Sequence, residues 1–175
     1  MPLPFFGECA IMGQKATRGS QTMNICFRKA VREDFDRVNE LFIEMLRAIY
    51  KREDVKQYQN SDLDYYFAGK EDWICVAEID GRIEGFLSIE VHRETENYLY
   101  YDDFSVSKAY RGMGIGSALM LEAESYCKTL GFSTVYLHVE ESNETARRFY
   151  EKRGFILHKT DGTRLCMVRK CGRKP

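Results

Sequence analysis

Hydrophobic and polar residues alternate along most of the chain with two different periods, and together they predict strands and helices. Alternation of period two, typical of strands, occurs at 25–28, 73–79, 82–91, 98–106, 134–139, 155–159 and 163–168. Apolar residues with a period near 3.6 form one face of two helices, at about 35–49 and 115–130. Two shorter helices are predicted, one that begins at Ser61-Asp62 and one over 143–152 that ends at Gly154.

The order of these elements restricts the topology. Asp80-Gly81 supplies a tight turn, so the three strands between 73 and 106 should form an antiparallel meander. The strand at 98–106 is followed by a helix and then by the strand at 134–139. Such a crossover makes these two strands parallel within an otherwise antiparallel sheet.

The chain length of 175 residues, with 44% hydrophobic residues, is suited to one domain with one substantial core. Residues 1–22 lack any periodicity. We therefore expect a disordered leader over 1–22, or a segment upstream of the natural start, with Met23 as a candidate first residue. A single domain is expected over 23–175.

Charge and cysteine content exclude several classes of protein. Lys and Arg number 26 against 27 Asp and Glu, which argues against general nucleic-acid binding. The six cysteines show no C-x-x-C spacing and the three histidines are scattered, so no metal site is predicted and reduced thiols are expected. The sequence contains neither a long apolar run nor a basic signal region, so we expect a cytoplasmic protein without a membrane partner.

A run of closely spaced glycines, Arg111-Gly-Met-Gly-Ile-Gly-Ser117, separates the strand at 98–106 from the next helix. Glycines let backbone N–H groups approach an anion, and the helix dipole adds positive potential, so a phosphate site is predicted. The spacing fits neither the dinucleotide fingerprint nor a P-loop. A turn that simply begins a helix is the alternative interpretation.

The motifs around this run resemble the GNAT superfamily of acyl-CoA-dependent N-acetyltransferases. The matching segments, in chain order, are YYDDFSV, RGMGIGS, VYLHVE, Asn143 and ARRFYEKRGF. The resemblance extends over about 24–168 and is strongest over 98–155. It implies an α+β (mixed α/β) fold with a mostly antiparallel sheet of about seven strands, one central parallel pair, and helices on both faces.

The resemblance also implies how acetyl-CoA would be bound. Amides of the glycine run would hold the pyrophosphate, and the Phe104 N–H would stabilise the developing oxyanion. Asn143 would bond the cofactor arm while it caps its helix. Tyr150 would be the general acid for the departing thiolate, with core packing as the alternative. The implied cofactor-binding residues are Phe104, Ser105, Val106, Arg111, Gly112, Met113, Gly114, Ile115, Gly116, Ser117, Asn143 and Tyr150.

A proton acceptor is needed because an amine attacks only when neutral. By strand alternation, Asp102 and Asp103 should point to opposite faces, so that only one lines the site. The segment is closest to the Glu-Asp-Phe-x-Val pattern of spermidine/spermine acetyltransferases, which places Asp102 at the catalytic base. Aspartate is shorter than glutamate, which favours a water relay. Three candidates for the base therefore stay open: Asp102, Asp103 and a water relay. Asp102 could instead be a solvated carboxylate or one that anchors the substrate.

The predicted reaction transfers an acetyl group from acetyl-CoA to the primary amine of a small acceptor, by direct attack in a ternary complex. A cysteine nucleophile such as Cys127 is the rival route, although burial explains this residue better. Residues 78–103 carry 2 basic and 8 acidic side chains, residues 104–175 carry 13 and 7, and this segregation favours a cationic acceptor.

Two other functions stay open, acetylation of a protein N-terminus or lysine and acyl-CoA binding without catalysis. The aromatic residues Tyr58, Tyr65, Tyr66 and Phe67 favour a partly closed pocket for a small acceptor, with core packing as their other explanation. Family members are often dimers, so the expected partners are the small-molecule amine and a second copy of the chain.

Overall fold

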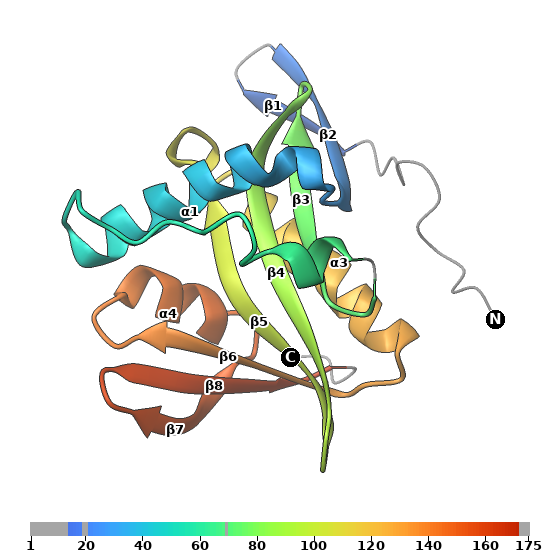
Figure 1. Ribbon diagram of the computed structural model, residues 1–175, viewed down its shortest axis with the longest axis vertical. Coiled ribbons are helices and arrows are strands. Elements are labelled where there is room, and N and C mark those ends of the chain that lie inside the picture. Colours follow the sequence, from blue (N-terminus) through green and yellow to red (C-terminus); the bar gives the residue numbers. More distant parts are fainter. Residues whose placement is uncertain (1–13, 19–20, 69, 172–175) are drawn as a thin grey trace.

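The computed structural model describes residues 14–18, 21–68 and 70–171, which form one sheet with helices on both faces (Figure 1). The strands are β1 (Gln14–Arg18), β2 (Gln21–Lys29), β3 (Trp73–Ile79), β4 (Arg82–Arg93), β5 (Asn97–Val106), β6 (Thr134–Glu140), β7 (Ile156–Asp161) and β8 (Arg164–Lys170). The α-helices are α1 (Phe35–Tyr50), α2 (Asp64–Phe67), α3 (Ile115–Thr129) and α4 (Glu144–Glu151).

The sheet has the order β1-β2-β3-β4-β5-β6-β8-β7. Neighbouring strands are antiparallel except for β5 and β6, which are parallel. The predicted meander of β3, β4 and β5 and the predicted parallel pair are therefore confirmed. Asp80 and Gly81 both have positive φ, as the tight turn between β3 and β4 requires.

The beginning of the described chain differs from the sequence expectation. Residues 14–18 and 21–22, expected in a disordered leader, lie in β1 and β2, which pair in antiparallel register. β1 is thus an eighth strand at the edge of the sheet. Its sequence, QKATR, has one apolar residue, so no hydrophobic alternation marks it as a strand. Residues 1–13 of the expected leader lie outside the described residues.

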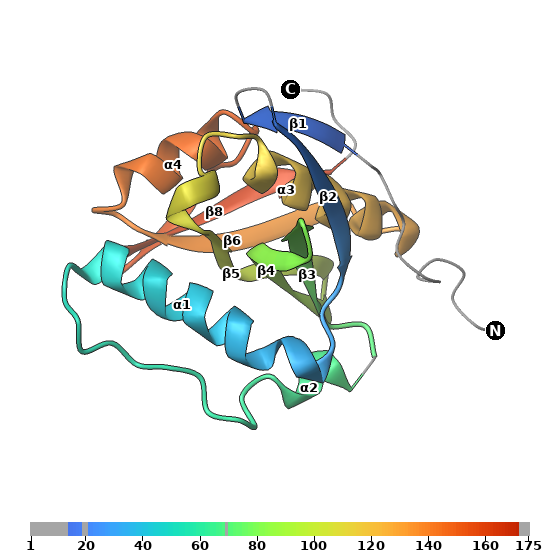
Figure 2. The same ribbon diagram turned by 90° about the horizontal axis from the view of Figure 1, so that it is seen from above.

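Two separate cores hold the helices on opposite faces, as Figure 2 shows from above. The larger core packs α3 and α4 against the sheet, with Leu119 and Leu137 fully buried in it. The smaller core packs α1 and α2 over β3 and β4, through residues such as Leu41 and Phe86. The smaller core includes no described residue of β5, β6, β7 or β8.

Two local predictions need correction. Helix α2 begins only at Asp64 and has no capping side chain, because Asp62 accepts a hydrogen bond from the Gln59 N–H in a preceding turn. Among the described cysteines Cys26 is disulfide-bonded, which the spacing did not predict. The thiols that are free, as predicted, are Cys75, Cys127, Cys166 and Cys171. No helix in the described ranges is both long and apolar enough to cross a bilayer.

Gly116 of α3 lies against the aromatic rings of Phe104 in β5 and Phe149 in α4. A Cβ atom at this position would lie 2.9 Å from Cζ of Phe104 and 3.4 Å from Cζ of Phe149. Carbon atoms of real side chains do not approach so closely, and an aromatic ring in a packed core cannot move aside freely. The absence of a side chain at Gly116 therefore sets the distance between α3 and β5.

We predict that Gly116→Ala lowers the free energy of unfolding by about 1–2 kcal/mol, because overpacking against Phe104 outweighs the gain of roughly 1 kcal/mol in helix propensity. Urea denaturation measures this effect. The double variant with Phe104→Leu should recover most of the loss relative to Phe104→Leu alone. A Gly116→Ala protein as stable as the unmodified chain would show that the contact does not limit packing.

Candidate active site

Strands β5 and β6 are paired over a short stretch only and then separate. Their parallel register runs from Leu99–Val135 to Tyr101–Leu137. Beyond it, β5 continues to Val106 along β4, and β6 continues to Glu140 along β8. Figure 1 shows the two strands diverging. One edge of β5 after Tyr101 therefore has no strand partner within the described chain.

The direction of the backbone amides on this edge follows from one hydrogen bond. The Ser107 N–H donates to the Glu84 carbonyl at 2.8 Å and so points toward β4. Successive amides of a strand point to opposite edges, and the register with β4 is unbroken from Phe104 to Val106. The N–H groups of Phe104 and Val106 thus point into the gap, whereas that of Ser105 points toward β4.

The glycine run forms the turn into α3 beside this gap. Gly112 and Gly114 have φ of 79° and 86°, and Gly114 is the N-cap of α3. The first helical hydrogen bond runs from the Ala118 N–H to the Gly114 carbonyl at 3.0 Å. The amides of residues 115–117 therefore have no acceptor within the helix, and Gly114 has no side chain to cap them. A cradle for an anion results.

Other residues of the run support the cradle. The Arg111 guanidinium donates to the Val106 carbonyl at 2.8 Å and pairs with Glu44 of α1 at 3.0 Å, so it fixes the turn and does not face the gap with a free charge. Ile115 is buried, and Met113 packs against the larger core. The run thus combines backbone amides for an anion with side chains that anchor the loop.

Arg153, which the sequence analysis missed, adds positive charge at the same place. Its guanidinium hydrogen-bonds the Ser117 hydroxyl and the Phe149 carbonyl, the latter at 2.9 Å, and lies 3.5 Å from the centre of the Phe149 ring. No carboxylate among the described residues forms an ion pair with it. The segment ARRFYEKRGF carries four basic residues, and only the fold shows which of them reaches the first turn of α3.

Tyr150 and Asn143 both belong to α4. Tyr150 is buried, with its ring near those of Phe104, Phe149 and Phe155. Its hydroxyl makes no hydrogen bond within the described residues. This hydroxyl is not one of the fully buried polar atoms that lack a partner, so it keeps some exposure. Burial, together with the charge of Asp103, raises the pKa of Tyr150, so the phenol stays protonated and can donate. Asn143 caps α4 by accepting from the Ala146 N–H at 3.2 Å.

Asp102 and Asp103 lie in a β-bulge, which overturns the expectation that they face opposite sides of the sheet. Between two flanking register pairs, β5 contributes both aspartates while β4 contributes only Ser88. The extra residue resets the alternation. Tyr58, from the α1 side, donates a hydrogen bond to Asp103, and Tyr66, from the same side, lies close enough to Asp102 that the two groups perturb each other's pKa values. Both carboxylates therefore face the same side.

The environment of these carboxylates favours their protonated forms. Loss of hydration, together with the negative charges of Asp103 and Glu90, raises the pKa of Asp102 to about 7, although the residue is exposed to solvent. Burial also raises the pKa of Asp103, opposed by the Tyr58 hydrogen bond and by Arg164. A carboxyl group that titrates near neutral pH can take up a proton in a reaction at that pH.

A second titratable pair lies next to the bulge, and sequence reasoning missed it. The Tyr100 hydroxyl and Nδ1 of His138 are 3.0 Å apart, across the parallel strands β5 and β6. Burial and Arg164 lower the pKa of His138, so its imidazole is neutral at pH 7. A neutral imidazole beside a phenol is also able to accept a proton. Only the parallel register of β5 and β6 shows that these two residues meet.

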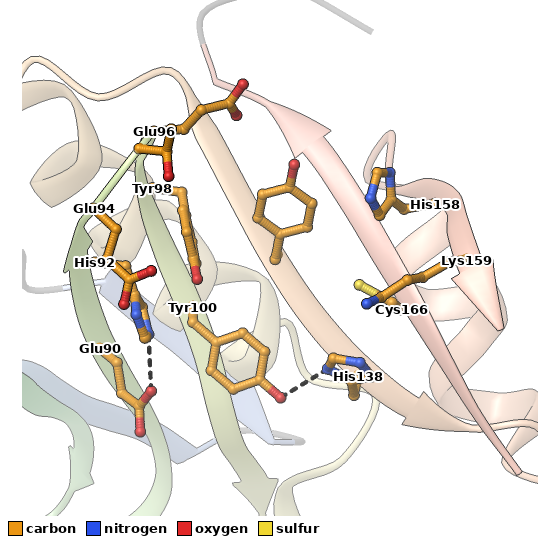
Figure 3. Close-up of a pocket in the computed structure, with 12 residues that line it drawn as sticks. Glu90, His92, Glu94, Glu96, Tyr98, Tyr100, His138, His158, Lys159 and Cys166 are labelled. Carbon is orange, nitrogen blue, oxygen red and sulfur yellow. Dashed lines mark hydrogen bonds and ion pairs between the residues drawn. The ribbon is translucent and has the colours of Figure 1, made fainter. Parts of the chain in front are cut away.

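Tyr100 and His138 border a pocket of about 480 Å³ on the face of the sheet opposite α3 (Figure 3). Aromatic side chains from β4 to β7 line it, including a stacked pair of His92 and Tyr98 and an edge-on contact of Tyr98 with Tyr136. Glu90 accepts hydrogen bonds from Tyr65 and Tyr66 at 3.3 and 3.4 Å. Tyr66 therefore serves both core packing and the pocket.

Cysteine and metal chemistry find little support at this site. Cys127 is fully buried in α3, and a hydrogen bond with Cys171, together with burial, raises the pKa of its thiol. Both effects oppose formation of the thiolate that a nucleophile requires. In the described part of the chain, no three His, Cys, Asp or Glu side chains are grouped so that they could hold a metal ion.

Comparison with known proteins agrees with this geometry. Residues 23–155 match the acetyltransferase (GNAT) family. Streptothricin acetyltransferase A of Bacillus subtilis is 27% identical over 148 residues, which cover 74% of this chain and 82% of that protein. An uncharacterized N-acetyltransferase of Archaeoglobus fulgidus is 30% identical over 131 residues, which cover 70% of this chain and 87% of that protein.

A solved structure supports the fold. PaiA N-acetyltransferase from Thermoplasma acidophilum, in complex with coenzyme A, superimposes with a TM-score of 0.76. The match covers 84% of this chain and 99% of that chain, at 23% sequence identity. Together with the family match over residues 23–155, these findings show that the chain belongs to the GNAT acetyltransferase family and is an N-acetyltransferase.

Proposed function

We propose that the protein transfers an acetyl group from acetyl-CoA to the primary amine of a small acceptor, by direct attack in a ternary complex. One observation carries this proposal. The unpaired edge of β5 lies between the N-terminus of α3, which can hold an anion, and a pocket lined by carboxylates and tyrosines. An anionic cosubstrate and an amine would thus meet at Phe104.

Acetyl-CoA supplies an acetyl thioester at one end and phosphates at the other. The amides of residues 115–117 and the loop from Arg111 to Gly114 fit the pyrophosphate, since the positive-φ glycines leave open space beside the backbone. The guanidinium of Arg153 adds a positive charge there. The outward amides of Phe104 and Val106, with the side-chain amide of Asn143, fit the polar arm.

At the reacting end, the Phe104 N–H donates a hydrogen bond to the thioester oxygen and stabilises the charge that develops on it as the amine attacks. The hydroxyl of Tyr150 donates a proton to the departing thiolate. Because the pKa of Tyr150 is raised, this proton is present throughout the neutral range. Phe104 also packs near Tyr150, with ring centres 6.4 Å apart, so both donors lie close together.

The acceptor amine is mostly protonated at neutral pH and must lose a proton before it can attack. This proton leaves on the side of the site where the acceptor binds. Asp102 is the proposed acceptor of this proton, directly or through water, because its pKa of about 7 is close to the working pH. Asp103 and the neutral imidazole of His138 are the alternative acceptors. All three lie on the side of the sheet that faces the pocket and away from α3.

A panel of amines tests the function. The protein is incubated with acetyl-CoA and small primary amines, peptides with free N-termini, or lysine-containing peptides, and released thiol and acetylated product are measured. Turnover with small amines supports the proposal. Turnover with peptides alone indicates protein N-terminal or lysine acetylation, and binding of acetyl-CoA without any turnover indicates a non-catalytic acyl-CoA-binding module.

The role of Tyr150 gives a direct prediction. Tyr150→Phe should lower kcat about 100-fold, within the usual range for loss of general acid catalysis, while the Kd of coenzyme A changes less than about threefold. Stopped-flow thiol detection and calorimetry provide the two values. Tyr126→Phe is the matched control with unchanged kcat, because this buried tyrosine of α3 packs against Trp73 and donates to the Glu71 carbonyl. Loss of coenzyme A binding in Tyr150→Phe would assign a structural role to this residue.

The base is identified by the pH profile. The ionised form of Asp102 accepts the proton, and ionisation increases as pH rises through the pKa of about 7, so kcat/KM should rise between pH 6 and pH 8. Asp102→Asn should remove this limb, whereas His138→Gln should keep it. The opposite pattern, with the limb lost only in His138→Gln, would transfer the role to the imidazole.

A further inference from the structure

We propose that the acceptor is a zwitterion, in which the reacting amine and a carboxylate belong to the same small molecule. The amine is placed at Asp102 and Asp103, and the carboxylate is held by Arg164 and Lys159. This inference rests on the proposed function, because it specifies the class of acceptor for the same site.

The two sides of the pocket carry opposite charge, as Figure 3 shows. Glu90, Glu94 and Glu96 come from β4 and the turn that follows it. Lys159 and His158 come from β7, on the other side. Tyrosines form the floor between them. A ligand that spans this floor therefore meets carboxylates at one end and basic groups at the other.

Arg164, the first residue of β8, brings a positive charge close to the reaction centre. Its guanidinium lies close enough to the Tyr100 hydroxyl to lower the pKa of that group, although burial dominates and raises it. It also lowers the pKa values of Asp102 and Asp103, although burial dominates both and raises them. Arg164 alternates along β8 with Leu165, which is buried in the larger core, so its side chain lies on the opposite face, the side of the two aspartates.

Neither Arg164 nor Lys159 has a salt-bridge partner within the described residues. Among the ion pairs of the described residues, none includes the Arg164 guanidinium or the Lys159 ammonium. Most other arginines near the sheet are paired, such as Arg28 with Asp34 and Arg37 with Glu84. Lys159 lines the pocket, and Arg164 is two residues from the lining Cys166 on β8, so each can form charge-assisted hydrogen bonds to an anionic ligand group.

The strand register places Lys159 in the same cross-strand row as His138 and Cys166. His138 is the cross-strand partner of Cys166, and Cys166 is the partner of Lys159. β6 and β7 are two strand spacings apart, roughly 10 Å, a distance that a lysine side chain can partly bridge. The small Cys166 lines the pocket between them, so it leaves room for a ligand group.

This inference differs from the cationic acceptor that the sequence favoured. Along the chain, acidic residues concentrate in 78–103 and basic residues in 104–175. Folding brings β7 and β8 beside β5 and β6, so that Lys159 and Arg164 lie near the acidic segment. The charges that are separate in sequence are therefore mixed around one pocket, and a second ammonium group would meet uncompensated positive charge.

The test uses sets of acceptors that share one carbon skeleton. Glycine, β-alanine and 4-aminobutanoate are each compared with the corresponding carboxamide, and with unbranched monoamines and diamines of the same length. Thiol release from acetyl-CoA by the full chain gives kcat/KM for each. We expect the best amino acid to exceed its carboxamide, and the matching diamine, by about tenfold or more, the effect of a charge-assisted hydrogen bond.

Variants separate recognition of the carboxylate from effects on the base. Arg164→Gln and Lys159→Gln should each reduce the ratio of kcat/KM for acid over carboxamide toward one, and a change in the base cancels in this ratio. Lys128→Gln, on α3 at the opposite face and paired with Glu124, is the matched control and should leave the ratio unchanged. A diamine or monoamine that exceeds every amino acid would overturn the inference.

The failure of the proposed function would look different. If no amine releases thiol, acetyl transfer to small amines is wrong, and calorimetry with the same compounds then decides the inference. Amino acids that bind the unmodified protein and lose about tenfold affinity in Arg164→Gln, whereas their carboxamides do not, would support a zwitterion site. Equal binding of acids and carboxamides would reject it.

Discussion

The site depends on one geometric constraint, the separation of β5 from β6 after only three paired positions. A strand edge without a partner presents backbone donors that must be satisfied by another group. The amides of Phe104 and Val106 occupy such an edge, next to the N-terminus of α3 and the ring of Tyr150. The bulge at Asp102 and Asp103 lies at the same point of β5 and turns both carboxylates toward the other side.

Electrostatics then distinguishes the two ends of the gap. At the α3 end, free helix amides and Arg153 create positive potential, suited to phosphates. At the pocket end, burial raises the pKa of Asp102 toward neutrality, and the nearby charges of Asp103 and Glu90 add to this effect. The same proximity lets a carboxyl group exchange a proton at physiological pH. The positive charge of Arg164 partly compensates the negative charges of Asp102 and Asp103.

Much of this arrangement could be predicted from the sequence, because it depends on patterns of residues that are close together in the chain. The meander, the crossover, the glycine turn and the capping by Asn143 each follow from residues adjacent in the chain. The bulge was missed, since two consecutive aspartates carry no signal of a register shift. The Tyr100–His138 contact and the positions of Arg153 and Arg164 depend on packing between distant segments. Strand β1 was missed because it has no apolar face.

The most direct test of this account is residue-resolved amide hydrogen exchange by NMR, with and without coenzyme A. The Phe104 and Val106 amides should exchange quickly in the free protein and at least about tenfold more slowly with coenzyme A bound, whereas the Ser107 amide, paired with Glu84, should be slow in both states. Protection of Phe104 and Val106 before coenzyme A is added, or no change after it, would contradict the claim that this strand edge holds the cosubstrate.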